Sequence, residues 1–284
     1  MNRSSILLCR FVFALVLILA GDTRSLFAQA QQFPPPAVVG QASHVSLFRR
    51  GDALVALGVA AVAAATATMS VDESLARSLQ RPSTRSNSML KGMTNVFSNL
   101  GFPGSAMISA GAYFLGLDKR SRPIAALGMH TGAAIVLGGV LSEGLAMTIG
   151  RSRPQLDVND AHNFRFGKGF SNDDFTSLPS AHVTVAFAAA TAANCEVGRS
   201  WPGAARYVTP ISYTAATLVG FSRMYKNKHW ASDVVAAAGL GTYSAVLFDR
   251  YNQGHPDNVF ERVFLPSSIL PVRHGIAVAW SLTR

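Results

Sequence analysis

A histidine, an aspartate and an arginine lie close together in the chain, within residues 222–233. His229 precedes Asp233 by four residues, so on a helix the two side chains would share one face. The carboxylate could then accept the proton of one imidazole nitrogen and leave the other nitrogen free to attack. Arg223, six residues before His229, would place a guanidinium beside a developing oxyanion. The spacing predicts a histidine nucleophile that is oriented by a carboxylate.

Two upstream segments contain the groups that this pair alone would lack. A His-x-x-x-Asp pair is usually an ordinary contact on a helix surface, so these segments decide the interpretation. Ser180 and the backbone amide of Ala181 follow a proline at the start of a long apolar helical run, where they would face an anion. His182 would lie in the first turn, placed to protonate a leaving group. Arg153 ends another apolar run just before a proline, and its guanidinium suits bidentate contact with phosphate oxygens. This inventory fits phosphoryl transfer.

The order Arg-Pro, Pro-Ser-small-His and Ser-Arg-x5-His-x3-Asp resembles the signature of the type 2 phosphatidic acid phosphatase (PAP2) superfamily, which also includes class A acid phosphatases and vanadium haloperoxidases. The resemblance covers roughly residues 50–250, and its third segment matches at every fixed position. It implies a phosphohistidine on His229, oriented by Asp233, with His182 as the acid. It implies no metal ion and no cofactor. The residues that it implies for binding the phosphoryl oxygens are Arg153, Ser180, Ala181 and Arg223.

The chain departs from that family pattern at two positions. The family has a lysine seven residues before the arginine of the first segment, where this chain has Ala146. The missing charge would weaken phosphate binding, unless Arg151 or Lys168 compensates as an auxiliary ligand. The family also has a glycine at the position of Ala181. An added methyl group is mild there, because alanine is favourable in the first turn of a helix.

The composition is that of a membrane protein. Of the 284 residues, 49% are hydrophobic and 14% are charged, well below the charged fraction of about 25% in soluble domains. The net charge of +10 does not indicate a nucleic-acid partner, because the basic residues are scattered through short connections and form no stripe interleaved with aromatic residues. Positively charged loops beside membrane spans explain them better.

Apolar runs predict an all-α fold, a bundle of about six helices embedded in the membrane with the active site at one end. Several runs are near the lower length limit for a span, which leaves a soluble helical core as the alternative. The predicted helices cover residues 53–70, 101–117, 124–146, 181–195, 207–222 and 232–249.

The sequence predicts that the chain is divided into four parts. Residues 1–30 resemble a bacterial secretory signal peptide, with an uncleaved anchor as the alternative. A linker follows at 31–49, then a PAP2-like phosphatase domain at 50–252 and a tail at 253–284 that contains a short strand. The protein would be exported, either in the inner membrane with a periplasm-facing active site or in the periplasm. Six spans and a cleaved signal conflict under the positive-inside rule, so the two locations stay open.

A polar loop and one further histidine also bear on the site. The polar loop at 155–178 predicts a flap beside the site, from which Lys168 could reach an anionic substrate. His130, on an apolar helix, is interpreted as a satisfied buried histidine and is left out of the site.

The predicted function is that of a metal-independent phosphatase, similar to acid or phosphatidate phosphatases, which hydrolyses phosphate esters through a phosphohistidine. The membrane-type helices favour a lipid phosphate or an isoprenyl diphosphate as the substrate and the membrane as a partner. The sequence leaves the oligomeric state open. Two alternatives remain, a vanadium-dependent haloperoxidase and a catalytically weakened membrane protein that binds lipid phosphates.

Overall fold

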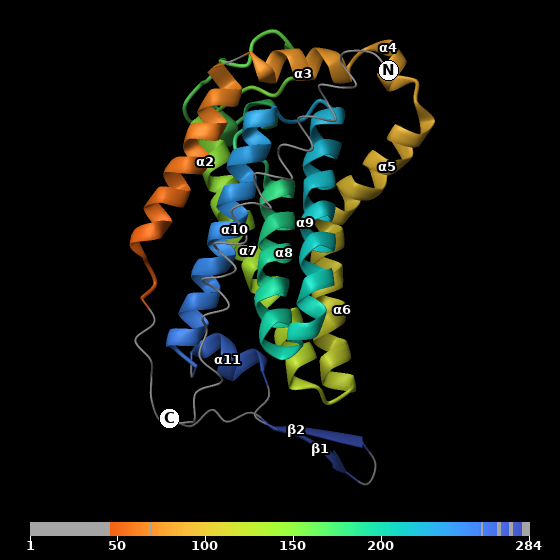
Figure 1. The fold of residues 1–284 in the computed structure, drawn as a ribbon, viewed down its shortest axis with the longest axis vertical. Helices are drawn as coiled ribbons and strands as arrows, with labels where there is room; N and C mark the ends of the chain where they lie inside the picture. Colours follow the sequence, from red (N-terminus) through yellow and green to blue (C-terminus); the bar gives the residue numbers. More distant parts are fainter. Residues whose placement is uncertain (1–45, 69, 257, 266–267, 273–274, 280–284) are drawn as a thin grey trace.

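The computed structural model describes residues 46–68, 70–256, 258–265, 268–272 and 275–279. Over these residues the chain folds into a helical bundle with one two-stranded hairpin (Figure 1). The predicted signal peptide and most of the predicted linker lie outside the described residues. The helices and strands are α2 (Arg50–Thr68), α3 (Val71–Leu79), α4 (Pro82–Arg85), α5 (Ser88–Asn99), the turn η1 (Leu100–Gly104), α6 (Ser105–Asp118), α7 (Arg122–Ile149), the turns η2 (Lys168–Phe170) and η3 (Asp173–Phe175), α8 (Ala181–Ser200), α9 (Pro202–Tyr225), α10 (Ala231–Gly254), α11 (Val259–Phe264), β1 (Ser268–Val272) and β2 (Gly275–Ala279).

The all-α bundle is confirmed, and all six predicted helices are present as α2, α6, α7, α8, α9 and α10. Four further helices were not predicted. α3, α4, α5 and α11 are short, and their mixture of polar and apolar residues gives no long apolar run. The strand that was expected in the tail is β2, which pairs antiparallel with β1.

Small residues allow the long helices to approach closely. A Cβ on Gly116 or Gly128 would collide with backbone atoms of the neighbouring helix in the α6–α7 pair, and a Cβ on Gly241 of α10 would meet the backbone of α8. Ser109 Oγ of α6 also donates a hydrogen bond to the Gly128 carbonyl of α7 at 2.6 Å. Close packing through glycine and serine is the usual way in which helices associate in a membrane.

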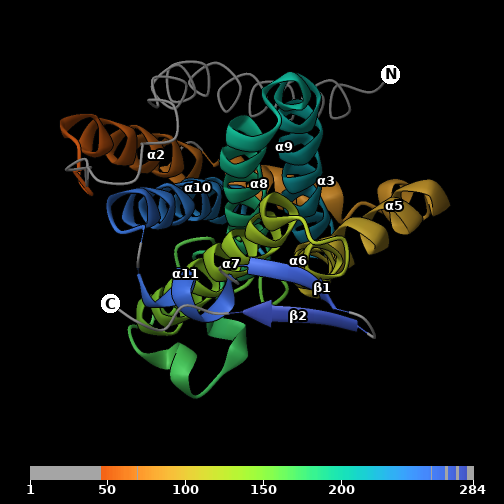
Figure 2. The same ribbon diagram turned by 90° about the horizontal axis from the view of Figure 1, so that it is seen from below.

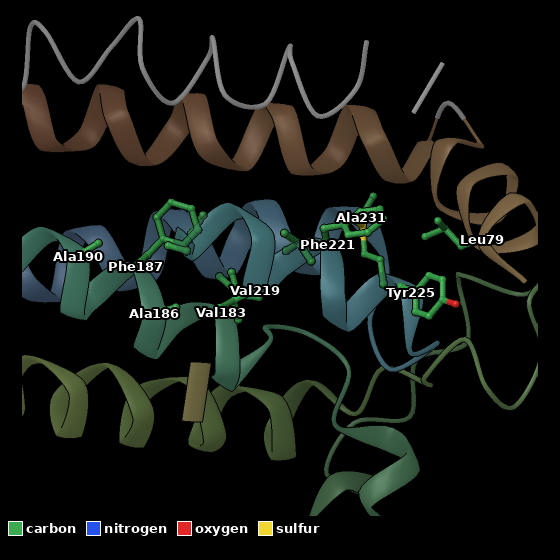
Figure 3. Packing of buried hydrophobic residues seen from close by; sticks show 14 residues of the cluster. Leu79, Val183, Ala186, Phe187, Ala190, Val219, Phe221, Tyr225 and Ala231 are labelled. Atoms are coloured by element: carbon green, nitrogen blue, oxygen red, sulfur yellow. The ribbon is translucent and has the colours of Figure 1, made fainter. Parts of the chain in front are cut away.

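The main buried core lies between α8, α9 and α10, with Leu79 of α3 at one end. Val183 of α8 and Val219 of α9 lie side by side in it, and both are almost fully buried (Figure 3). Phe187 fills the space one turn further along α8. This core fixes the end of α8 and the end of α9 from which the predicted site residues come.

Among the described residues, four stretches are long and apolar enough to cross a membrane: Gly51–Thr68, Ser88–Asp118, Arg122–Ile149 and Ala231–Gly254. Their outward surface is apolar, and Leu54 of α2, Met107 of α6 and Val140 of α7 are all largely exposed. An outward apolar surface is expected where helices face lipid. The protein is therefore a membrane protein, as the composition predicts.

The two ends of the bundle differ. At one end α7 stops at Gly150, whose φ of +66° gives the left-handed turn that commonly closes a helix, and α3 and the 150–180 connection cover this end (Figure 1). At the other end lie the α6–α7 and α8–α9 connections, α11 and the hairpin (Figure 2). Tyr113 fastens α11 there, because its hydroxyl donates a hydrogen bond to the Phe264 carbonyl at 2.7 Å.

Candidate active site

The predicted site residues all lie at the end of the bundle that α3 covers, each at or near the end of a long helix. Arg153 follows α7, Ser180 is the residue that precedes α8, Arg223 is in the last turn of α9, and His229 lies just before α10. The charges of Arg223 and Arg153 act on the imidazoles of both His182 and His229. The three sequence segments therefore meet in one place.

His229 is buried, with 5% of its surface exposed. Its Nδ1 lies 2.7 Å from the Ser177 carbonyl oxygen, which can only accept, so Nδ1 is the protonated nitrogen of the neutral ring. Nε2 then keeps its lone pair. Burial holds the pKa of His229 well below its usual value, and the positive charge of Arg223 acts in the same direction. The ring is therefore a neutral imidazole with Nε2 available as a nucleophile.

Asp233 does not make the predicted direct hydrogen bond with His229. Its Oδ2 lies 4.0 Å from His229 Nδ1 and instead accepts bonds from Ser177 Oγ at 2.5 Å and from the Trp230 amide at 2.8 Å. The prediction assumed a shared helix face, but His229 precedes the first residue of α10 by two positions. Asp233 thus holds Ser177, and the Ser177 carbonyl holds the imidazole.

Arg151 lies in a buried network in which Nε, Nη1 and Nη2 all donate hydrogen bonds to protein groups. Its guanidinium is therefore not available as an auxiliary phosphate ligand. Only 1% of its surface is exposed, and its guanidinium donates to Asp72 Oδ2 at 2.8 Å, to Asp233 Oδ1 and to Ser232 Oγ. Asp72 also accepts hydrogen bonds from the backbone amide and the hydroxyl of Ser232. The expectation that Arg151 replaces the missing lysine is therefore wrong.

Three of the predicted phosphate ligands carry a buried donor without an acceptor. Arg153 donates from Nη2 to Thr176 Oγ1 at 2.8 Å, and Arg223 donates from Nη1 to Ser98 Oγ at 3.2 Å. The Nε of each arginine and the Oγ of Ser180 are buried and have no partner. In the part of the chain that the structure describes, eight buried side-chain atoms lack a partner, and these are three of them. Buried donors are normally paired, so their concentration here indicates an anion site.

His182 is the second residue of α8 and is partly buried. Burial lowers its pKa to about 4, and the positive charges of Arg223 and Arg153 act in the same direction. A dianionic phosphate would oppose both effects and favour the imidazolium. The amides of Ala181 and His182 belong to the first turn of α8, whose amides have no partner within the helix.

One lysine acts on the site and was not predicted from the sequence, namely Lys226. It follows the last residue of α9, and its charge contributes to the low pKa of His182. Burial and the charge of Arg223 lower the pKa of Lys226 itself. Lys168, the other auxiliary candidate, is exposed on η2 and makes no side-chain hydrogen bond or ion pair with any described residue. Ala146 is buried within α7.

Ser177, Asp72 and Ser98 also contact the site and were not predicted. Ser177 lies in the polar connection before α8, which was expected to be a flap, and it touches both His229 and Asp233. Asp72 comes 79 residues before its partner Arg151. Spacing patterns in the sequence relate only residues that are close in the chain, so they could not predict this contact. Among the described residues, no group of three or more His, Cys, Asp or Glu side chains is placed to hold a metal ion.

Residues 127–255 match the model of the PAP2 superfamily. This stretch of the chain, just under half of its 284 residues, is similar to the PAP2 superfamily. The matched PAP2 region contains all three predicted segments, whereas Asp72 of α3 lies outside it.

One relative and one solved structure are similar to this chain. A lipid A 1-phosphatase of Porphyromonas gingivalis is 42% identical over 65 residues, which is 23% of this chain and 14% of that protein. The crystal structure titled as the first transmembrane PAP2 type phosphatidylglycerolphosphate phosphatase, from Bacillus subtilis, gives a TM-score of 0.48 with 22% identity, over 74% of this chain and 98% of that one.

Proposed function

We propose that this protein is a metal-independent phosphatase that hydrolyses a lipid phosphate ester through a phosphohistidine on His229. The observation that carries the proposal is the group of buried, unpaired donors on Arg153, Ser180 and Arg223 beside a neutral imidazole. Donors of this kind can hold three phosphoryl oxygens, and the free Nε2 can attack phosphorus.

The reaction has two steps. In the first, His229 Nε2 forms a bond to phosphorus, the bond from phosphorus to the ester oxygen breaks, and the His182 imidazolium donates its proton to the leaving alcohol. In the second, the now neutral His182 accepts a proton from water, the hydroxide oxygen bonds to phosphorus, and the bond from Nε2 to phosphorus breaks. Asp233 is a positioning residue, because it acts through Ser177.

Two observations support a lipid substrate. The site lies at the end of a bundle with four helical stretches that are apolar enough to cross a membrane. The Porphyromonas gingivalis relative is named a lipid A 1-phosphatase, and its 42% identity to this chain extends over 65 residues.

The distribution of basic residues supports a site on the outer side of the membrane. Lys119 and Arg120 lie in the α6–α7 connection and Arg122 is the first residue of α7. Arg199 and Arg206 flank the α8–α9 connection. Both connections are at the end opposite the site (Figure 1). Basic connections tend to stay in the cytoplasm, so the site would face the periplasm of a bacterial cell.

The test uses the full-length protein in detergent with EDTA and a phosphatidate substrate. We expect phosphate release by the wild type, an acid-labile phosphate on His229 after rapid quenching, and loss of both in His229→Ala. His255→Ala is the matched control, because His255 is exposed and bonded only to its own helix. Equal phosphate release by the wild type and His229→Ala would overturn the proposal. Bromide oxidation with added vanadate and peroxide tests the haloperoxidase alternative on the same samples.

A further inference from the structure

An apolar groove of about 440 Å³ lies between α5 and α9. Its walls are hydrophobic apart from one threonine, which suits a hydrocarbon better than a polar ligand. α5 leans away from the bundle in both views, so the groove opens on the outward surface rather than in the core (Figures 1 and 2). The lining residues are Phe97 of α5 and Pro210, Ile211, Thr214, Ala215 and Leu218 of α9.

The groove lies near the predicted phosphate ligand Arg223. Phe97 in its wall is followed in the chain by Ser98, whose hydroxyl accepts a hydrogen bond from Arg223 Nη1 at 3.2 Å. Leu218 lies five residues before Arg223 on the same helix, and Pro210 lies thirteen residues before it. At a rise of 1.5 Å per residue, the groove therefore runs from about 8 Å to about 20 Å from Arg223 along α9.

The surface around the groove is apolar and exposed. One wall belongs to the apolar stretch Ser88–Asp118, which is long enough to cross a membrane. Ile211 in the other wall is 70% exposed, which is unfavourable in water and favourable against lipid chains.

We propose that this groove holds an acyl chain of the lipid phosphate whose head group binds to Arg153, Ser180 and Arg223. The inference rests on the proposed function and deepens it, because it makes chain length a determinant of substrate choice. A short or water-soluble phosphate ester would use the phosphate site alone, whereas a long-chain lipid would gain affinity from each methylene group in the groove.

The test fills the groove and compares two substrates. Ala215→Trp places a large side chain in the groove, and Ala64→Trp puts the same change on the exposed outward face of α2 as the matched control. With long-chain phosphatidate in mixed micelles, we expect kcat/KM to fall at least about tenfold in Ala215→Trp, which corresponds to the lost burial of two or more methylene groups. With a soluble aryl phosphate, both variants should match the wild type.

A binding measurement separates failure of this inference from failure of the proposed function. Long-chain phosphatidate and inorganic phosphate are titrated into the His229→Ala protein, with and without Ala215→Trp. The inference requires weaker phosphatidate binding and unchanged phosphate binding in the filled-groove variant, whether or not the wild type shows turnover. Equal phosphatidate affinity, or an equal loss for both ligands, would overturn it. If Ala215→Trp does not fold, Thr214→Trp at the exposed neighbouring position is used instead.

Discussion

We predict that Lys226 supplies the positive charge that is missing at Ala146, because it lies three residues after Arg223 and its charge acts on His182. We predict that Lys226→Met raises KM for a phosphate ester about three- to tenfold, the loss expected from one partly exposed charge at an anion site. Steady-state kinetics at several salt concentrations measure the effect.

Lys228→Met is the matched control for that measurement. Its Nζ donates to Gln155 Oε1 at 2.6 Å, so its charge is already used elsewhere. If both variants keep the wild-type KM, Lys226 has no role in binding the phosphate group.

The two site histidines also predict a dependence of stability on pH. The folded-state pKa of His182, about 4, lies below the usual 6.5, and that of His229 is lowered as well. Below pH 6.5 the unfolded chain therefore binds more protons than the folded protein, so stability falls as the pH is lowered towards 4. The loss approaches about 1.4 kcal/mol per pH unit for a fully shifted histidine, and less for the partly buried His182.

Thermal unfolding in detergent between pH 7 and pH 5 measures this dependence. His182→Asn should show a shallower fall of Tm with decreasing pH than the wild type, and His255→Asn should not. Identical slopes in all three proteins would mean that the imidazole of His182 is not held neutral.

At the scale of single elements, α3 is tied to α10 and to the start of the 150–180 connection by one buried carboxylate. Asp72→Asn leaves the Arg151 guanidinium with less negative charge around it, and breaking a buried ion pair costs about 3–5 kcal/mol. We predict a lower Tm for this variant, measured by thermal unfolding, together with a lower kcat, because Arg151 also holds Asp233.

Asp118→Asn is the comparison variant. Its carboxylate pairs with Lys119 at 3.1 Å on the surface, where an ion pair contributes at most about 1 kcal/mol. Equal Tm losses in the two variants would show that the Asp72 contact is no stronger than a surface pair.

The long apolar helices could be predicted from the sequence, because an apolar run of span length has few other stable conformations in lipid. The same apolar runs also predicted that the site residues lie near helix ends, because a proline, a polar residue or a loop ends each run beside them. These residues are Arg153, Ser180, Arg223 and His229. The Asp233 contact could not be predicted, because it depends on where α10 begins. Asp72 could not be assigned either, because it reaches Arg151 only through the packing of α3 over the bundle end.

At the scale of the whole molecule, the proposed phosphate ligand Arg223 and the apolar groove both lie on α9. In the proposed complex, the head group would lie at the polar end of the bundle and the acyl chain along its apolar flank. The positively charged connections at the far end suit the opposite face of the membrane.

The ion pair between Asp72 and Arg151 also determines which part of the chain would have to be included if the site were transferred to another protein. A fragment confined to residues 127–255 would keep the proposed nucleophile, acid and phosphate ligands. It would lack Asp72, one of the two carboxylates that pair with the buried Arg151 guanidinium. A fragment that retains this ion pair must therefore include α3, and so must begin well before residue 127, where the family match starts.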